Sequence, residues 1–410
     1  MEQQVIILVE PSFYGVSYVR EAKKLNCYVV VVVSDAQNPE LYGYTGLYDE
    51  MLVCDIRDAS ALYAVIEQRR FHHIDAIISA TDYAISNTAQ VAEQLGIRSL
   101  SVKTGKLVRN KDLARRCFTE HGVPSAQFAV VQTVEQALAA AKHIGYPVVL
   151  KPTNTASSQH VSFLRNDDEL KSAFTKLSGF VTSYMGFKVR DEYLIEEYLD
   201  GQEFSVEIFV EEGRVVFAAM TEKVTSDLPF FVEKFHIFPS SVLQAEQHAI
   251  IDVAAQALTA IGLRNGPAHV EIKRTSKGPK IVEVNGRPGG DNITSDLIPS
   301  AYHIDIFRQT ILNVLGLDTD FAVSHPSSSA VGFLCAPQAG RLRAIHHLDL
   351  LDKDPAVVRY HLCAKMGERV KVPESSDDRL GYVIVNRPTP KEAKAKVVEL
   401  IEKLKVEVDV

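Results

Sequence analysis

Short apolar runs alternate with helical periodicity at the start of the chain. The runs Val5–Val9, Val29–Val33 and Ala76–Ser79 have the length of strands, and Val29–Val33 is five consecutive valines. Runs without polar alternation are typical of parallel strands that are buried on both faces. Apolar residues recur at helical spacing over Val16–Leu25. Strands that alternate with helices predict an α/β domain with a Rossmann-like parallel sheet over residues 1–105.

The pattern changes after this domain and divides the rest of the chain into three units. Residues 106–185 alternate helices with short strands, and we expect one helix over Lys106–His121. Residues 186–318 have the pattern of an antiparallel sheet with helices. Residues 319–410 hold short strands and an amphipathic closing helix, Lys391–Lys403, which predict a small α+β domain. The fold class is therefore α/β and α+β.

Composition and charge narrow the function classes. The 410 residues are 46% hydrophobic and 23% charged, which is ordinary for a globular protein. The net charge of -8 argues against nucleic-acid binding, which needs a basic patch. No run of about 18 apolar residues and no signal-peptide pattern occur, so neither a membrane span nor secretion is expected. The five cysteines lie far apart without a C-x-x-C motif, which predicts reduced thiols in the cytoplasm.

The first strand-to-helix turn, Glu10–Gly15, tests a dinucleotide-binding interpretation. It holds one glycine, where a nicotinamide-binding turn needs three for close approach to the pyrophosphate. The pattern therefore favours a domain that frames a substrate cleft, because ligands lie at the carboxyl ends of such strands.

Two alternating runs around Ser276–Gly278 predict a β-hairpin over residues 269–285. A three-residue loop with Gly278 in the left-handed position sets the register. The predicted cross-strand pairs are Thr275 with Pro279, Glu271 with Glu283, and His269 with Asn285. Alternation places on one face His269, Glu271, Lys273, Glu283 and Asn285. The opposite face, toward the core, receives Val270, Ile272, Val282 and Val284.

Two glutamates opposed across this hairpin call for a cation. Their Cβ atoms are expected about 4.5–5.5 Å apart, so the carboxylates repel each other unless a cation lies between them. Oxygen-only ligation by Glu271, Glu283 and Asn285 suits Mg²⁺, with Mn²⁺ as an alternative, and leaves room for phosphate oxygens. The competing interpretation is a solvated hairpin in which Lys273 neutralises Glu271. The tight glycine turn that follows carries Arg287, which favours a triphosphate site.

The run PAHVEIKRTSKGPKIVEVNGRPGGD resembles the metal-binding motif of the ATP-grasp superfamily. The resemblance extends over the whole chain and is strongest over residues 106–292. It implies an ATP-grasp fold with four units: a Rossmann-like N-terminal domain (1–105), a small or lid domain (106–185), a catalytic domain with the Mg²⁺ site (186–318) and a C-terminal α+β domain (319–410). Within the superfamily the chain is most similar to bacterial L-amino acid ligases, by its Glu-Pro start and the segments Pro229–Ser240 and Arg379–Val385.

The resemblance also implies an ATP site. Its residues are Lys111, Lys151, Ser157, Ser158, Glu196, Glu197, Leu199 and Glu203. By that resemblance the backbone of Glu197 and Leu199 reads the adenine edge, and Glu203 binds the ribose hydroxyls. Taken alone, each lysine or glutamate could equally be a solvated surface residue. The lid loop Thr153–His160 departs from the family because it has no glycine, whereas lids usually wrap phosphates with glycine-rich backbone.

The reaction implied by the resemblance joins a carboxylate to an amine or thiol through an acyl-phosphate. A carboxylate has a poor leaving group, phosphorylation provides a good one, and cations offset the charge on the transferring phosphoryl group. The catalytic candidates are Arg287 and Lys151. The substrate-binding candidates are Glu233, His236, Arg287, Gly289 and Asp291. A packed histidine is the alternative for His236, and a helix cap is the alternative for Asp291.

Three functional hypotheses follow. The first is a cytoplasmic ligase that joins two amino acids into a dipeptide and releases ADP and phosphate. The second attaches an amino acid to a carrier-protein thiol or another metabolite amine, as in antibiotic biosynthesis. The third is a non-catalytic ATP-binding protein, which the glycine-free lid alone supports. Amino acids are the expected partners, without nucleic acid or membrane, and a homodimer is an alternative to a monomer.

Overall fold

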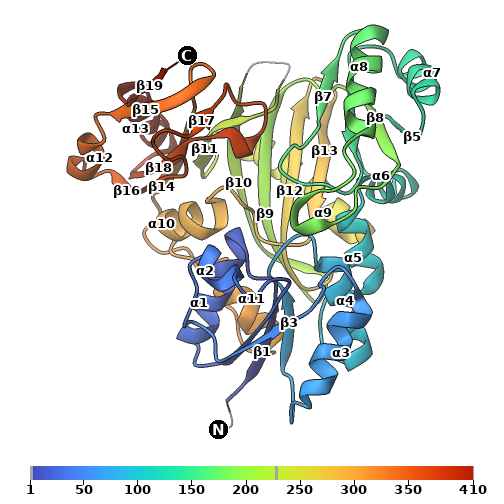
Figure 1. Ribbon diagram of the computed structural model, residues 1–410, viewed down its shortest axis with the longest axis vertical. Helices are drawn as coiled ribbons and strands as arrows, with labels where there is room; N and C mark the ends of the chain where they lie inside the picture. Colours follow the sequence, from blue (N-terminus) through green and yellow to red (C-terminus); the bar gives the residue numbers. More distant parts are fainter. Residues whose placement is uncertain (1–2, 227–229, 410) are drawn as a thin grey trace.

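The N-terminal part of the protein is a parallel sheet covered by helices on both faces (Figure 1). The computed structural model describes residues 3–226 and 230–409. The strand order is β3-β2-β1-β4, with the bounds β1 (Val5–Val9), β2 (Tyr28–Val33), β3 (Glu50–Val53) and β4 (Ala76–Ser79). Alternate valines of β2 face α1 (Val16–Lys24) on one side and α3 (Ala59–Arg69) with α4 (Ile85–Leu95) on the other. All five valines are fully buried, which confirms the predicted strand.

Gly15 closes the first strand-to-helix turn, in a 3-10 turn at Phe13–Gly15. A Cβ on Gly15 would lie only 1.7 Å from the carbonyl oxygen of Ala80. Since Ala80 directly follows β4, which pairs with β1, the glycine lets two neighbouring strand ends approach each other. The need for glycine here is explained by backbone packing.

The second unit is an antiparallel sheet of order β5-β8-β6-β7. Its strands are β5 (Phe128–Val131), β6 (Val148–Pro152), β7 (Ser162–Leu164) and β8 (Tyr193–Glu197), and its helices are α7 (Val134–Ile144) and α8 (Asp167–Ser178). The sheet therefore continues past residue 185 as far as Glu197. A short helical turn, Tyr184–Gly186, precedes β8.

The single helix expected over Lys106–His121 is wrong. The structure has α5 (Val102–Arg109) and α6 (Lys111–Glu120), separated at Asn110, whose φ of -125° and ψ of 103° are extended. The break lets the Lys111 backbone N–H donate to the Thr153 carbonyl oxygen at 2.8 Å. Lys111 therefore begins a helix directly beside the lid loop.

The third unit is a large sheet of order β13-β12-β9-β10-β11-β14-β18-β16. Its strands are β9 (Gln202–Glu211), β10 (Arg214–Thr225), β11 (Glu233–Phe238), β12 (Gly266–Thr275), β13 (Gly278–Asn285), β14 (Ser328–Leu334), β16 (Val357–Leu362) and β18 (Gly381–Arg387). The helix α9 (Gln244–Ile261) packs on the half formed by β9, β12 and β13. Strands from the C-terminal region thus extend the same sheet (Figure 1).

Smaller elements complete the C-terminal half. A sheet of order β17-β15-β19 and α13 (Pro390–Lys403) form a common core with β14 and β18. The remaining bounds are α2 (Asn38–Leu41), η3, a π-helix (Ile293–Leu297), α10 (Ile298–Tyr302), α11 (Ile306–Val314), β15 (Gly340–His346), α12 (Asp349–Lys353), β17 (Arg369–Val370), η4 (Ser376–Asp378) and β19 (Lys405–Asp409). Pro229, the first residue of the segment Pro229–Ser240, lies outside the described residues. None of the helices in the described ranges is long and apolar enough to cross a membrane.

The β12–β13 hairpin has the predicted pairs where they matter for chemistry. Glu271 lies opposite Glu283, and His269 lies opposite Asn285. The loop prediction is wrong, because Thr275 pairs with Gly278 and the turn has two residues instead of three. A bulge next to Glu271 restores the register by inserting Val282 as an extra residue. Consequently Ile281 takes the core position, and Val282, predicted to be buried in the core, lines a cavity instead.

The Gly15 contact predicts a selective loss of stability. Gly15→Ala should destabilise the protein by about 1–3 kcal/mol, because its Cβ has no room beside the Ala80 carbonyl. Gly179→Ala is the matched control, since its nearest neighbour would be an ordinary 3.6 Å away. That control should leave stability unchanged or slightly higher. Urea denaturation of both variants checks this, and equal midpoints would contradict the packing argument.

Candidate active site

Two adjoining cavities lie among the three units: a large cavity of about 840 Å³ and a small cavity of about 170 Å³. They share the lining residues Ala156, Ser157, Lys223, Glu233, Glu271 and Arg287. These residues come from the lid loop, the large sheet and the turn after the hairpin. The cavities are therefore two compartments of one site that meet at a charged junction.

The structure brings nearly all predicted site residues together. The small cavity is lined by all the predicted ATP and metal residues: Lys111, Lys151, Ser157, Ser158, Glu196, Glu197, Leu199, Glu203, Glu271, Glu283 and Asn285. The large cavity is lined by the predicted substrate residues Glu233, His236, Arg287 and Asp291. Gly289 lies outside both linings, and its backbone N–H donates to the Glu207 carboxylate at 3.2 Å. Gly289 therefore packs behind the site, because any side chain there would collide with His269 and Glu207.

A buried carboxylate between two cations forms the floor of the small cavity. Glu196 Oε2 lies 2.5 Å from Lys151 Nζ, and Glu196 Oε1 accepts from Arg115 Nε at 2.6 Å. Burial disfavours the charged form of Glu196, but Arg115 and Lys151 outweigh burial and lower the pKa of its carboxyl. Burial also lowers the pKa of the Lys151 ammonium, which Glu196 partly offsets. Lys151 is thus fixed by a partner charge, as a buried ammonium requires.

Lys223 is the cation at the junction of the two cavities. Its Nζ lies 2.8 Å from Glu203, 2.9 Å from Glu271 and 3.5 Å from Glu233. Burial opposes its charge, yet the surrounding carboxylates raise the pKa of Lys223 well above its ordinary value. Lys273 instead lies 3.9 Å from Glu203 and donates to the Leu199 carbonyl at 3.2 Å. The charge of Glu271 is therefore balanced by Lys223, and the proposed role of Lys273 in neutralising it is wrong.

The hairpin face meets the requirements of a hard divalent cation. Glu283 lies 3.0 Å from Lys111, Glu271 lies 2.9 Å from Lys223, and Asn285 lines the same cavity. Burial disfavours the charged form of Glu271, but Lys223 and His269 hold its pKa well below the ordinary range, so it is an anionic oxygen donor. Within residues 3–226 and 230–409, no three His, Cys, Asp or Glu side chains converge on one point. Two glutamates and an amide fit Mg²⁺ when phosphate oxygens complete the shell.

The His269 ring lies between the carboxylates of Glu207 and Glu271 and contacts both. His269 Nδ1 lies 2.6 Å from Glu207, and His269 Nε2 lies 3.5 Å from Glu271. Burial works against the charged ring, but Glu207 and Glu271 raise the pKa of His269 to about 9. The protonated ring therefore orients the Glu271 carboxylate toward the cavities.

Arg287 is held by the N-terminal domain. Its Nε donates to Asp82 at 3.2 Å, and Asp82 also pairs with Arg109. Burial disfavours the charged form of Asp82, but the two arginines outweigh it and lower the pKa of its carboxyl. The Arg287 guanidinium also lies 5.2 Å from the centre of the Tyr14 ring. Tyr14 and Asp82 follow β1 and β4, so the carboxyl ends of the parallel strands do frame the cleft, as expected.

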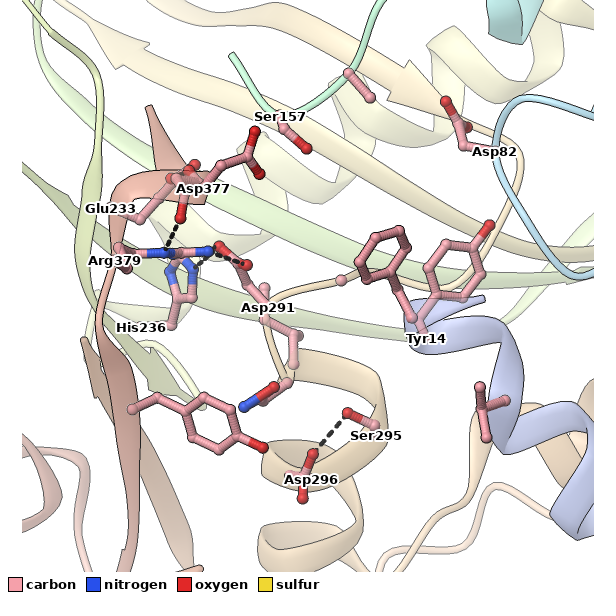
Figure 2. A pocket seen from close by; sticks show the side chains of 18 of the residues that line it. Tyr14, Asp82, Ser157, Glu233, His236, Asp291, Ser295, Asp296, Asp377 and Arg379 are labelled. Atoms are coloured by element: carbon pink, nitrogen blue, oxygen red, sulfur yellow. Dashed lines mark hydrogen bonds and ion pairs between the residues drawn. The ribbon is translucent and has the colours of Figure 1, made fainter. Parts of the chain in front are cut away.

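Figure 2 shows a half-buried ion pair on one wall of the large cavity, where Arg379 faces Asp291 and His236. Arg379 donates to both Asp291 oxygens, at 2.7 and 2.9 Å, and His236 Nε2 lies 3.3 Å from Asp291. Burial disfavours the charge of Asp291, but Arg379 and His236 hold its pKa well below the ordinary range. The Arg379 guanidinium also stacks 3.8 Å from the centre of the Phe333 ring. The helix-cap alternative for Asp291 therefore gives way to a bidentate ion pair.

The lid loop has backbone dihedral angles typical of glycine, although it contains no glycine. Ser157, Ser158 and His160 have φ values of 57°, 54° and 54°, the left-handed region that glycine adopts most easily. Lys111 Nζ donates to the Thr155 carbonyl at 2.6 Å, which ties the loop to α6. The loop thus presents serine side chains and backbone to both cavities.

Sequence reasoning missed Arg115, Lys223, Asp82, Tyr14 and Arg379 as site residues. Arg115 had a signal, because it follows Lys111 by four residues on one helix and therefore shares its face. Asp82 and Tyr14 also had one, since they follow parallel strands at their carboxyl ends. Lys223 had none, because its partners come from three other strands that only the sheet brings together.

Known proteins share this architecture. A family model described as an ATP-grasp domain matches residues 144–296, and one described as L-amino acid ligase C-terminal domain 2 matches residues 332–409. The alanine–anticapsin ligase of Bacillus subtilis is 29% identical over 60% of this chain and 55% of the ligase. The L-arginine-specific L-amino acid ligase of Bacillus subtilis is 22% identical over 79% of this chain and 78% of the ligase. The crystal structure of L-amino acid ligase from Bacillus licheniformis has a TM-score of 0.84 over both whole chains at 20% identity, which shows the ATP-grasp fold.

The Glu196 triad predicts a pH-dependent loss of stability. Glu196→Gln leaves two buried cations without a counter-charge and should cost about 3–5 kcal/mol at neutral pH. Because the folded pKa of Glu196 lies below 4.5, its contribution is present above pH 4.5 and is lost as pH falls through the folded pKa. The difference between wild type and variant should therefore shrink in acid.

Urea denaturation at pH 7 and in acid measures this difference. Glu374→Gln, which breaks an exposed pair with Lys371, is the control and should change stability by less than about 0.5 kcal/mol. A Glu196→Gln variant as stable as that control at pH 7 would refute the triad.

Proposed function

The chain is an ATP-grasp ligase related to the L-amino acid ligases, and from this premise we propose that it joins two amino acids into a dipeptide. The observation that carries this proposal is the junction of the two cavities at Lys223, Glu271 and Arg287. A site for phosphoryl transfer between two substrates needs cations and metal ligands where the substrates meet.

The small cavity is the proposed ATP compartment. Lys111 and Lys151 are the proposed cations for the phosphates, and Glu203 is the proposed partner of the ribose hydroxyls, since all three line this cavity. The Glu197 N–H is already used by the Gln127 carbonyl at 2.9 Å. This leaves the Glu197 carbonyl and the Leu199 N–H for the adenine edge. Glu271, Glu283 and Asn285 are the proposed ligands of Mg²⁺, which when bound neutralises charge on the transferring phosphoryl group.

The large cavity is the proposed amino-acid compartment. Glu233 accepts from Ser376 at 2.5 Å and lies 3.5 Å from Lys223, so it stands close to the junction. With Asp291 on the same wall, it offers carboxylate oxygens to the ammonium group of the first amino acid, and His236 lies beside Asp291. Arg287 faces both cavities and has the position to bind the carboxylate that is activated.

The reaction has two balanced steps. An oxygen of the first amino acid's carboxylate attacks the γ-phosphorus, so that an O–P bond forms, the bond to the β,γ-bridging oxygen breaks and ADP leaves. The neutral amine of the second amino acid then attacks the acyl carbon, a C–N bond forms and phosphate leaves. The amine proton goes to solvent. The chain's own contribution is to hold both substrates and to stabilise the negative charge of the phosphoryl group and of the acyl oxygen.

The second candidate function transfers the activated amino acid to a carrier-protein thiol or another metabolite amine. The alanine–anticapsin ligase supports an antibiotic pathway as one setting, because anticapsin is named as the partner of alanine there.

The cytoplasm is the proposed compartment. The free thiols of all five cysteines support it: Cys27, Cys54, Cys117, Cys335 and Cys363.

An assay with defined substrates tests the function. The protein is mixed with Mg-ATP and pools of amino acids, and phosphate release is measured together with the mass of the product. Dipeptide masses with equal amounts of phosphate are the expected result. Phosphate release only with an added carrier protein or amine would support the second candidate, and none with any pool would exclude a ligase.

The metal assignment predicts a specific loss of turnover. Glu283→Ala should reduce kcat at least about a hundredfold, because a direct ligand matters more than an outer partner whose loss costs about 10–100-fold. The fold should persist, since Glu283 lines a cavity and is not part of the apolar core. Glu212→Ala, an exposed change on another strand end, is the control. If Glu283→Ala retains turnover with normal Mg²⁺ dependence, Glu283 is not a ligand of the metal.

A further inference from the structure

Nearly all the cationic side chains that line the large cavity are already balanced by a carboxylate. Four of them lie within 3.2 Å of one: Lys223 with Glu271, Arg287 with Asp82, Arg359 with Asp296, and Arg379 with Asp291. Arg20 also lines this cavity. In the ranges 3–226 and 230–409, Arg20 is within ion-pair distance of no carboxylate. Among the Lys and Arg side chains that line this cavity, it is therefore the one whose charge no carboxylate of the described residues offsets.

Helix α1 presents Arg20 to the cavity by its spacing. Ser17 and Arg20 stand three residues apart and both line the cavity, so one face of α1 forms part of the wall. The other face is packed in the core through Tyr18, Val19 and Ala22. Arg20 itself is exposed and lies outside that core.

The wall opposite α1 carries carboxylates, and two of them already have cationic partners. Figure 2 shows Glu233, Asp291 and Asp377 on one side of the cavity, with the helix that follows Tyr14 on the other side. Asp377 accepts a hydrogen bond from Tyr184. Glu233 lies 3.5 Å from Lys223 and Asp291 is paired with Arg379, whereas no carboxylate of the described residues offsets the charge of Arg20 on the other side.

We propose that Arg20, with Ser17, binds the free α-carboxylate of the second amino acid. This inference rests on the proposed dipeptide synthesis and names the acceptor class: amino acids or peptides with a free carboxylate, in preference to carrier thiols and carboxylate-free amines. The acceptor amine must reach the junction at Arg287, where phosphate charge accumulates. Its own carboxylate is repelled from that point and is stabilised at the distant cation.

The neighbouring aromatic side chains complete the subsite. Phe13 and Tyr42 line the same cavity, and their rings pack edge to face with centroids 5.2 Å apart. They provide an apolar surface for the acceptor side chain in the same cavity as Arg20. The cavity volume of about 840 Å³ lies within the range of about 300–1,000 Å³ typical of small-molecule sites, so two amino acids fit in it.

Steady-state kinetics with paired acceptors test the proposal. The acceptor found in the pool assay is compared with its α-carboxamide, which keeps the amine and side chain but removes the charge. Wild type should prefer the free acid about tenfold or more in kcat/KM, the worth of a charge-assisted hydrogen bond. Arg20→Gln should raise KM for the acid about 10–100-fold and abolish that preference. KM for ATP and for the first amino acid should stay unchanged.

Arg116→Gln is the matched control, because Arg116 is an exposed helical arginine that lines neither cavity. It should retain the wild-type preference for the acid, and Arg20→Lys should recover part of it. Equal use of acid and amide by wild type would overturn the proposal, as would an Arg20→Gln variant with unchanged KM for the acid. Equal losses on acid and amide in Arg20→Gln would also overturn it, since they indicate a structural role. No turnover with any substrate pool refutes the dipeptide function itself.

Discussion

The repulsion between Glu271 and Glu283 is the constraint around which the site is organised. The hairpin register places these carboxylates opposite each other, so the protein must supply positive charge on both sides. Lys223 serves Glu271, Lys111 serves Glu283, and the protonated His269 steadies Glu271 from behind. Each partner comes from a different element. The two carboxylates of one hairpin therefore form ion pairs with helix α6 and with strand β10.

The N-terminal domain takes part in the site through Arg287. Asp82 accepts from both Arg287 and Arg109, and the Tyr14 ring lies beside the Arg287 guanidinium. An arginine that is fixed by a carboxylate keeps its remaining donors in a defined direction. The Rossmann-like sheet thus contributes positioning and one wall of the large cavity. The close strand contact at Gly15 and Ala80 belongs to the same edge of that sheet.

The C-terminal region is continuous with the large sheet that carries the β12–β13 hairpin. Strands β14, β18 and β16 extend it beyond β11, and Arg379, just before β18, reaches Asp291 in the turn after the hairpin. The large cavity is therefore lined by the N-terminal domain, the large sheet and the C-terminal region together. Because Asp291 is charged and bonded on two sides, its geometry is fixed before any substrate arrives. This pre-organisation suits the proposed acyl transfer, which depends on substrates held in a fixed geometry.

The sequence by itself determined the local parts of this picture. Period-two alternation determined which face of the hairpin carries Glu271, Glu283 and Asn285, and uninterrupted valines determined a doubly covered strand. It failed where one residue shifts a register, as at Val282, because a two-residue turn and a compensating bulge leave no trace in alternation. Only the tertiary structure decided which carboxylates pair with Lys223, and that Arg20 has no carboxylate partner among the described residues. Ion pairs between distant strands and helices depend on how the sheets are ordered in space, and no spacing along the chain encodes that order.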